Sequence, residues 1–381
     1  MFHTMLTLAF IIPNIYVYLR ILQLFINKGF RLYYSFIYIL IASIYPLSNL
    51  ISEENTGFMA TIFTSIANYQ LPFYLYLFLI MLVFDVLLII NRLIKIIHFE
   101  IMKSTRFKIT GLSVILFLSL AVVVAGVINF NTIRTSEYSI NVQRKSARID
   151  HLKIAFVADF HLQEKTDVHF VEQFVKKIAI LKPDLMLFGG DIVEGDKNDG
   201  NMIVFEKLLR EIKPNYGFFA VLGNHEFSAG QNKESFFNKA GIKVLCDTTV
   251  IIDHSFNLTG RYDSHFGRRK NIADLLKSVT DSLPVILIDH RPTEIDQVSK
   301  TAVDVHLSGH THNGQLFPFN LIVNRMYKLT WGYRKIGNTH FFVTSGIRLW
   351  GPPVRTTGKS EIMVIDINFT RQPSEVALGS R

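Results

Sequence analysis

Cysteine is almost absent from this chain of 381 residues. The single thiol, Cys246, can form no internal disulfide and no cysteine-rich zinc cluster. The N-terminus also lacks the basic segment that precedes the apolar core of a cleavable signal peptide. Acidic residues are outnumbered, with 31 Asp and Glu against 40 Lys and Arg, and the formal net charge is +9. This balance indicates either a basic binding face or loops that orient a membrane protein.

Apolar residues gather in the first 130 positions, and the mean hydropathy of the chain, +0.27, is high for a soluble protein. Four apolar stretches there are long enough to cross a bilayer, which takes about 20 residues. They cover residues 4–25, 33–52, 70–91 and 110–130. Buried core helices are disfavoured because the stretches are too long and too uniformly apolar. We therefore predict that residues 1–130 form a region of four transmembrane helices.

The charges of the connecting loops predict an orientation. The loop after the first span contains Lys28 and Arg31, and the loop after the third span contains five basic residues. The loop between the second and third spans has Glu53 and Glu54 but neither Lys nor Arg. Because positively charged loops stay in the cytoplasm, the chain should leave the fourth span on the outer side. We therefore predict a multi-pass cell-membrane protein whose C-terminal domain lies outside the cytoplasm.

One ionisable residue, Asp85, falls inside the third predicted span. A charge inside a membrane is costly, so it is either functional or paired. Asp85 lies toward the predicted cytoplasmic end of its span. We expect it to pair with Arg92 or with another basic neighbour.

The pattern changes after residue 150, where short apolar runs alternate with amphipathic helical stretches. Predicted strands cover residues 152–159, 184–191, 216–224, 284–290, 302–309, 341–346 and 361–369. Helical spacing is found at residues 168–182 and 202–212. This alternation predicts an α/β domain over residues 151–370 with a largely buried sheet. Residues 131–150 are interpreted as a polar linker, and residues 371–381 as a polar tail.

Polar side chains with metal-binding chemistry follow five of these strands. They are Asp159 and His161, then Asp191, then Asn224 with His225 and Glu226, then His290, and finally His310 and His312. Ligands of α/β sheets bind beyond the carboxyl ends of the strands, so these five segments are expected to converge. Each segment alone is weak, and a lone histidine is more often structural than a metal ligand. The ordered set, with every member at a strand end, predicts a site.

The donor types indicate two divalent metal ions. Carboxylate, imidazole and amide oxygen suit Mn²⁺, Fe or Zn²⁺. A shared carboxylate can hold two such ions about 3.5–4 Å apart, which lowers the pKa of a bridging water and suits phosphate ester hydrolysis. A third histidine close to His310 and His312, His306, lies within the preceding predicted strand and is interpreted as structural.

These motifs, in this order, resemble those of the calcineurin-like metallophosphoesterase superfamily over residues 150–370. The segment GHTHNGQ and the later TSGIRLWGPPVRTTGKSEIMVIDI are similar to a membrane-associated bacterial branch that includes YkuE-type proteins. The chain departs from that branch at Asn313, where glycine is common, and at Lys359-Ser360, where proline often precedes the glutamate.

The resemblance implies two sandwiched β-sheets flanked by helices and a site that holds two metal ions. One ion would be bound by Asp159, His161, Asp191 and His312, with Asp191 bridging. Asn224, His290 and His310 would join Asp191 on the second ion. His225 would act on the leaving group as general acid or charge stabiliser. Attack would come from a metal-bridging hydroxide.

Arg355 follows Gly351-Pro352-Pro353 and is a candidate phosphate contact. Location near a bilayer makes membrane lipids expected partners and a lipid-linked phosphoester or pyrophosphate an expected substrate class. We expect no nucleic acid partner, because much of the positive charge flanks the membrane and no aromatic–basic pattern stands out. An alternative is a membrane sensor or transport component in which the phosphoesterase domain is regulatory.

Overall fold

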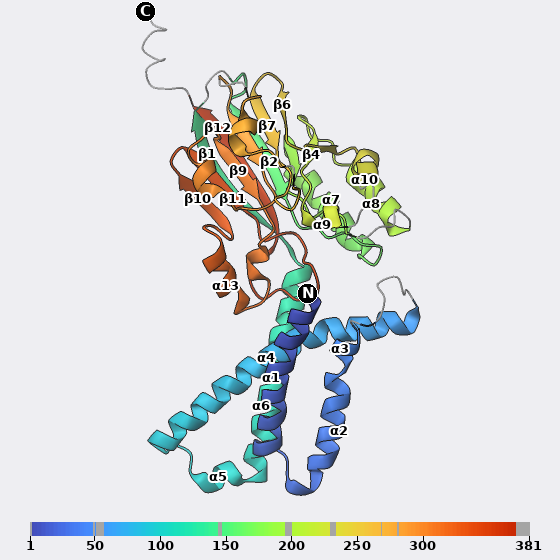
Figure 1. Ribbon diagram of the computed structural model, residues 1–381, viewed down its shortest axis with the longest axis vertical. Coiled ribbons are helices and arrows are strands. Elements are labelled where there is room, and N and C mark those ends of the chain that lie inside the picture. The colour runs from blue at the N-terminus through green and yellow to red at the C-terminus, as the bar shows by residue number, and fades with distance from the viewer. Residues whose placement is uncertain are drawn as a thin grey trace, which may run out of the picture. The chain divides into compact units, whose positions relative to one another are not determined.

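The computed structural model describes residues 2–48, 50, 57–143, 147–194, 200–228, 234–267, 269–279 and 282–370. Its contacts divide the chain into two compact units (Figure 1). The first, the helical unit, contains Met1–Asn129 and Gly351–Thr356. The second, the α/β unit, contains Phe130–Trp350 and Thr357–Arg381.

The described part of the helical unit is built from helices. They are α1 (Phe2–Leu24), η1 (Lys28–Phe30), α2 (Arg31–Ala42), α3 (Ile44–Ser48), α4 (Phe58–Ile94), α5 (Phe99–Lys103) and α6 (Thr105–Asn131). Three helical stretches are long and apolar enough to cross a membrane: Lys28–Ser48, Phe58–Ile94 and Thr105–Asn131. In α1 the apolar stretch found is Phe10–Leu24, which is shorter than a span. Three candidate spans are thus found where four were predicted, and part of the predicted span 33–52 lies outside the described residues.

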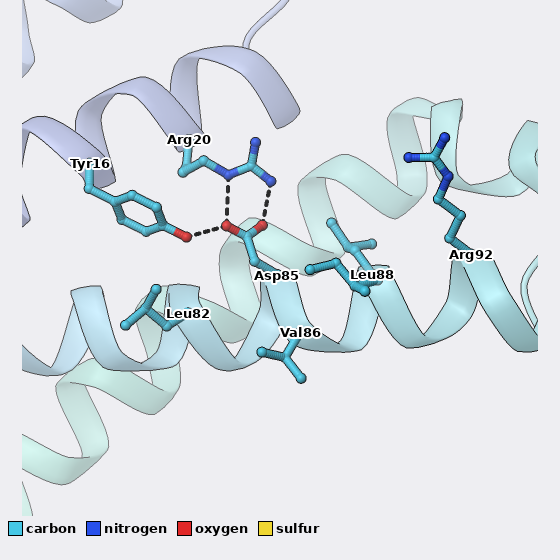
Figure 2. Close-up of a pocket in the computed structure, with 8 residues that line it drawn as sticks. Tyr16, Arg20, Leu82, Asp85, Val86, Leu88 and Arg92 are labelled. Atoms are coloured by element: carbon cyan, nitrogen blue, oxygen red, sulfur yellow. Dashed lines mark hydrogen bonds and ion pairs between the residues drawn. The ribbon is translucent and has the colours of Figure 1, made fainter.

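Asp85 on α4 pairs with Arg20 of α1 rather than with Arg92 (Figure 2). The Arg20 guanidinium holds both carboxylate oxygens, with Nε 2.7 Å from Oδ2, and the Tyr16 hydroxyl donates to the same oxygen. A guanidinium matches a carboxylate in this forked geometry, so the pair offsets much of the cost of placing either charge between apolar helices. The expected pairing of Asp85 with a basic neighbour is therefore found, with the partner on another helix.

Two mixed six-stranded sheets form the centre of the α/β unit (Figure 1). The first sheet has the order β1-β12-β2-β3-β4-β5 and the second has the order β10-β11-β9-β8-β7-β6. The first is made of β1 (Ile133–Gln143), β2 (His151–Val157), β3 (Leu185–Phe188), β4 (Phe218–Ala220), β5 (Lys243–Val244) and β12 (Ser360–Thr370). The second is made of β6 (Thr248–Ile252), β7 (Phe256–Gly260), β8 (Val285–Ile288), β9 (Val305–Ser308), β10 (Gly332–Ile336) and β11 (Thr339–Val343).

Apolar side chains fill the space between the two sheets, and helices cover their outer faces. Ile154, Phe156 and Leu187 of the first sheet pack with Ile286 and Leu307 of the second. The other face of the first sheet packs against α7 (Val168–Leu181), α8 (Asn201–Arg210) and α10 (Glu234–Lys239). The other face of the second packs against α11 (Ile272–Leu276) and α12 (Ile295–Val298). The predicted sandwich with flanking helices is confirmed.

The interpretation of residues 131–150 as a linker is wrong for most of its length. Residues 133–143 form β1, which pairs in parallel with β12 from Ile133–Ser360 to Gln143–Thr370. The strand is amphipathic, with Ile133, Ile140 and Val142 buried and Arg134, Glu137, Ser139 and Asn141 exposed. An edge strand with one solvated face carries this mixed composition, and it lacks the continuous apolar run of the central strands. The predicted tail, 371–381, lies outside the described residues.

Candidate metal centre

The predicted site residues follow strand ends from both sheets. Asp159 and His161 follow β2, Asp191 follows β3, and Asn224 follows β4 and begins α9 (Asn224–Ser228). In the second sheet His290 follows β8, and His310 and His312 follow β9, with His312 beginning η2 (His312–Gly314). The loops are joined by main-chain hydrogen bonds, including Gly309 N–H to the His290 carbonyl at 2.9 Å. The His310 N–H donates across the sheets to the Asp159 carboxylate at 3.0 Å.

The structure brings the predicted carboxylates and imidazoles together in three overlapping groups. Within each group, the metal-binding atoms all lie within 4.8 Å of one another. The groups are Asp159–His161–His312, His161–Asp191–His225 and Asp191–His290–His310. His161 belongs to the first and second groups, and Asp191 to the second and third. Each group could hold a metal ion, and the second contains His225, which was not expected to be a ligand. Two ions that share Asp191 stay a prediction.

The backbone at these residues is held in a costly conformation. Asp159, His161, Asp191, His310 and His312 all have positive φ, between 48° and 69°. Residues other than glycine rarely adopt a positive φ, and each one that does lowers stability by about 1–3 kcal/mol. Five such residues in one site indicate that the fold accepts a loss of stability in order to direct these side chains toward a common point.

The orientation of two buried histidines fits a metal ion. His290 Nδ1 lies 2.8 Å from the Gly189 carbonyl and donates to it, which leaves Nε2 as the ring nitrogen that could bind an ion. That Nε2 lies 3.1 Å from Asp191 Oδ2. His161 Nε2 is buried, and no residue in the described part of the chain forms a hydrogen bond with it. Buried nitrogens without such partners are costly, and an ion would satisfy them.

A glutamate that the sequence analysis named without a role, Glu226, fixes the loop that carries Asp191. It is buried, and its carboxylate accepts four backbone N–H bonds from two separate segments. The donors are Asp191 at 2.9 Å, Ile192 at 2.5 Å, Val193 at 3.0 Å and Gly223 at 2.7 Å. A Cβ at Gly223 would lie 2.2 Å from Asp191 Oδ1, so glycine alone permits this approach. Glu226 thus positions the shared carboxylate from behind.

Glu194, which sequence reasoning missed, lies beside His225. Its Oε1 is 3.3 Å from His225 Nδ1, and its Oε2 is 3.5 Å from His161 Nδ1. Burial lowers the pKa of His225, but Glu194 and Asp191 outweigh it and the net pKa is raised. Burial raises the pKa of Glu194, but the two histidines outweigh it and the net pKa is lowered. The only signal in the sequence was a carboxylate three residues after Asp191.

Burial and neighbouring charges separate the two aspartates. Burial, with the nearby Asp191 carboxylate, raises the pKa of Asp159 to about 6. Burial acts in the same direction on Asp191, but His290 overcomes it and holds the pKa well below the ordinary value. Asp191 is therefore the more firmly ionised of the two.

Three further predicted residues have other surroundings. Asn224 Oδ1 accepts a hydrogen bond from Arg291 at 2.9 Å, and its role as metal ligand stays a prediction. Arg355 is fully buried, and its main chain bonds to Gly126 and Asn129, so its phosphate contact also stays a prediction. His306 is buried inside β9 and packs on Phe341, in agreement with a structural role.

Comparisons with known proteins give the same identification. The calcineurin-like phosphoesterase family model matches residues 152–314. An uncharacterized metallophosphoesterase of Aquifex aeolicus is 31% identical over 62% of this chain and 92% of that protein. One of Helicobacter pylori is 35% identical over 55% of this chain, which spans 58% of the relative's length. A zebrafish relative, named as a transmembrane protein with metallophosphoesterase domain, is 26% identical over 69% of this chain and 63% of that protein.

The matched region contains the strand ends that carry Asp159, Asp191, His290 and His310. The Aquifex relative is covered over nearly its whole length, so the similarity extends over a complete domain. The chain belongs to the calcineurin-like phosphoesterase family.

Proposed function

We propose that this protein is a membrane-anchored phosphoesterase that hydrolyses a phosphoester or pyrophosphate bond with two divalent metal ions. The observation that carries the proposal is the convergence of three ligand groups that overlap at His161 and Asp191. One ion would be held by Asp159, His161, Asp191 and His312. The other would be held by Asp191, Asn224, His290 and His310.

The ions, when bound, would activate a water and offset the negative charge that develops on the phosphate. The remaining chemistry belongs to side chains of this chain. His225 belongs to the second ligand group, and its Nδ1 lies 3.3 Å from Glu194 Oε1. Its raised pKa keeps a proton available on the ring, so His225 can donate to the leaving oxygen. Glu194 orients the ring and stabilises its charged form.

Lipid-linked phosphoesters are the substrate class that the location favours. The candidate spans Phe58–Ile94 and Thr105–Asn131 would hold the chain in a bilayer, and α6 ends two residues before β1 begins. We extend this proposal to the predicted topology of four spans. The α/β unit would then lie outside the cytoplasm, because basic residues gather in the loops after the first and third predicted spans.

The test uses the full chain in detergent, stripped of metal and then given Mn²⁺, Zn²⁺ or Fe²⁺. Hydrolysis of a chromogenic phosphodiester and a chromogenic monoester is followed for the wild type, Asp191→Asn and His225→Ala. We expect metal-dependent turnover, its loss in Asp191→Asn and a fall of about 10²–10⁴-fold in His225→Ala. His169→Ala, an exposed histidine on α7, is the matched control and should keep full activity. Turnover that survives in Asp191→Asn would favour the alternative of a regulatory domain.

A further inference from the structure

The helix α13 (Phe319–Met326) presents apolar side chains to its surroundings. All of its residues are described, and none is buried. The exposed apolar residues of the helix and the segment before it are Phe317, Phe319, Leu321, Ile322 and Met326, with exposed fractions from 43% to 68%. Arg325 is exposed among them, and Lys328, exposed after the end of the helix, forms an ion pair with Asp296. Apolar residues flanked by basic ones are typical of a helix that lies in a membrane interface.

This helix borders the candidate metal centre at both of its ends. At its start, a Cβ on Gly314 of η2 would lie 2.4 Å from the Asn320 backbone nitrogen, so the first turn packs directly on the loop of His312. At its end, the ring of Tyr327 lies 6.3 Å from the ring of His310. The exposed apolar side chains therefore stand on the rim of the site.

The first residues of the α/β unit also lie near the candidate metal centre. The guanidinium of Arg348 lies 4.7 Å from the ring of Phe130, the residue before the last of α6. The Arg348 N–H donates to the carbonyl of Asp159 at 3.0 Å. Thr357 lies shortly before β12, the strand that pairs with β1. Its Oγ1 donates to the Asn313 carbonyl of η2 at 2.8 Å. Phe130, at the start of the α/β unit, therefore lies beside Arg348, whose main chain is bonded to Asp159.

We propose that α13 and the preceding Phe317 lie in the surface of the bilayer and present lipid head groups to the metal centre. The apolar side chains would contact acyl chains, and Arg325 would lie among lipid phosphates. The substrate class that follows is a phosphoester or pyrophosphate that carries acyl chains. This second part rests on the proposed function, whereas the membrane contact of α13 does not.

The membrane contact is tested with the full chain in nanodiscs of phosphatidylcholine and phosphatidylglycerol. Cys246 is replaced by Ser, and Ile322→Cys is labelled with an environment-sensitive fluorophore. Lipids with a spin label on the acyl chain should quench the fluorophore at position 322. The control is Ile180→Cys on α7, which is 79% exposed and should not be quenched. Equal quenching at both positions, or none at position 322, overturns the proposal.

The substrate part is tested by kinetics of the double variant Leu321→Ser, Ile322→Ser. Both side chains are exposed, so the fold should be kept. We expect the KM for a phospholipid in mixed micelles to rise by about tenfold or more and turnover of the soluble chromogenic ester to stay unchanged. Equal changes for both substrates, or no change for the lipid, contradict presentation by α13. Quenching at position 322 in a protein that hydrolyses neither substrate rejects the proposed function and supports the membrane contact.

Discussion

The substitution Glu226→Gln should cost both stability and metal affinity. In the wild type each carboxylate oxygen accepts two backbone N–H bonds, from Ile192 and Val193 on Oε1 and from Asp191 and Gly223 on Oε2. Glutamine keeps the shape but turns one oxygen into an NH₂ donor, which faces two N–H donors. The neighbouring Asp191, whose φ is +54°, is then no longer held.

The magnitude follows from the two donors that lose their acceptor. A buried backbone N–H without a partner costs about 1–3 kcal/mol, so the free energy of unfolding should fall by about 2–6 kcal/mol. Loss of a residue that supports a metal ligand typically weakens metal binding by about 10–100-fold. Chemical unfolding and calorimetric titration of metal-stripped protein with Mn²⁺ measure the two effects separately.

Glu206→Gln provides the matched control. Glu206 is also buried, but it lies on α8 and its ion-pair partner is Lys239, 3.8 Å away. We expect this variant to bind metal as the wild type does. The positioning role assigned to Glu226 is refuted if Glu226→Gln has the same free energy of unfolding and the same Mn²⁺ affinity as the wild type.

Two further substitutions test pairs and burial elsewhere in the chain. Asp85→Asn removes the carboxylate that Arg20 holds. Since the pair is only partly buried, the free energy of unfolding in detergent should fall by about 1–3 kcal/mol. An unchanged melting temperature would contradict this. His306→Leu should make stability less sensitive to acid. Burial, with the charges of Arg261 and Arg269, lowers the pKa of His306 to about 3. The unfolded chain, with a histidine pKa of about 6.5, takes up a proton that the fold excludes, so stability is lost as the pH falls from about 6.5 toward 3. At pH 5 the wild type should have lost about 2 kcal/mol from this residue and the variant none; parallel pH profiles would show that His306 does not contribute.

The metal-binding side chains could be predicted because their position depends on a simple rule. Central strands are continuous apolar runs, and polar residues that follow them must gather at the sheet edge. Asp159, Asp191, His290 and His310 all obey this rule, and the structure brings their side chains together. The alternation of strands and helices predicted an α/β domain, and the resemblance to the family implied its two sheets.

The residues that support the site could not be predicted in this way. Glu226 and Glu194 act through partners that only the tertiary fold supplies, such as the N–H groups of Ile192 and Val193. Strand β1 was missed because one of its faces is solvated and its sequence is mixed. The partner of Asp85 depends on how α1 packs against α4. The spacing of residues along one helix does not predict that packing.

The metal content of the purified full-length protein tests the central claim most directly. Metal-stripped protein in detergent is supplied with Mn²⁺ or Zn²⁺, freed of excess ion and measured by elemental mass spectrometry, beside Asp191→Asn and the control His169→Ala. The account predicts two ions per chain in the wild type and the control, and loss of bound metal in Asp191→Asn. A folded protein that takes up no metal, or an Asp191→Asn variant that keeps both ions, would contradict it.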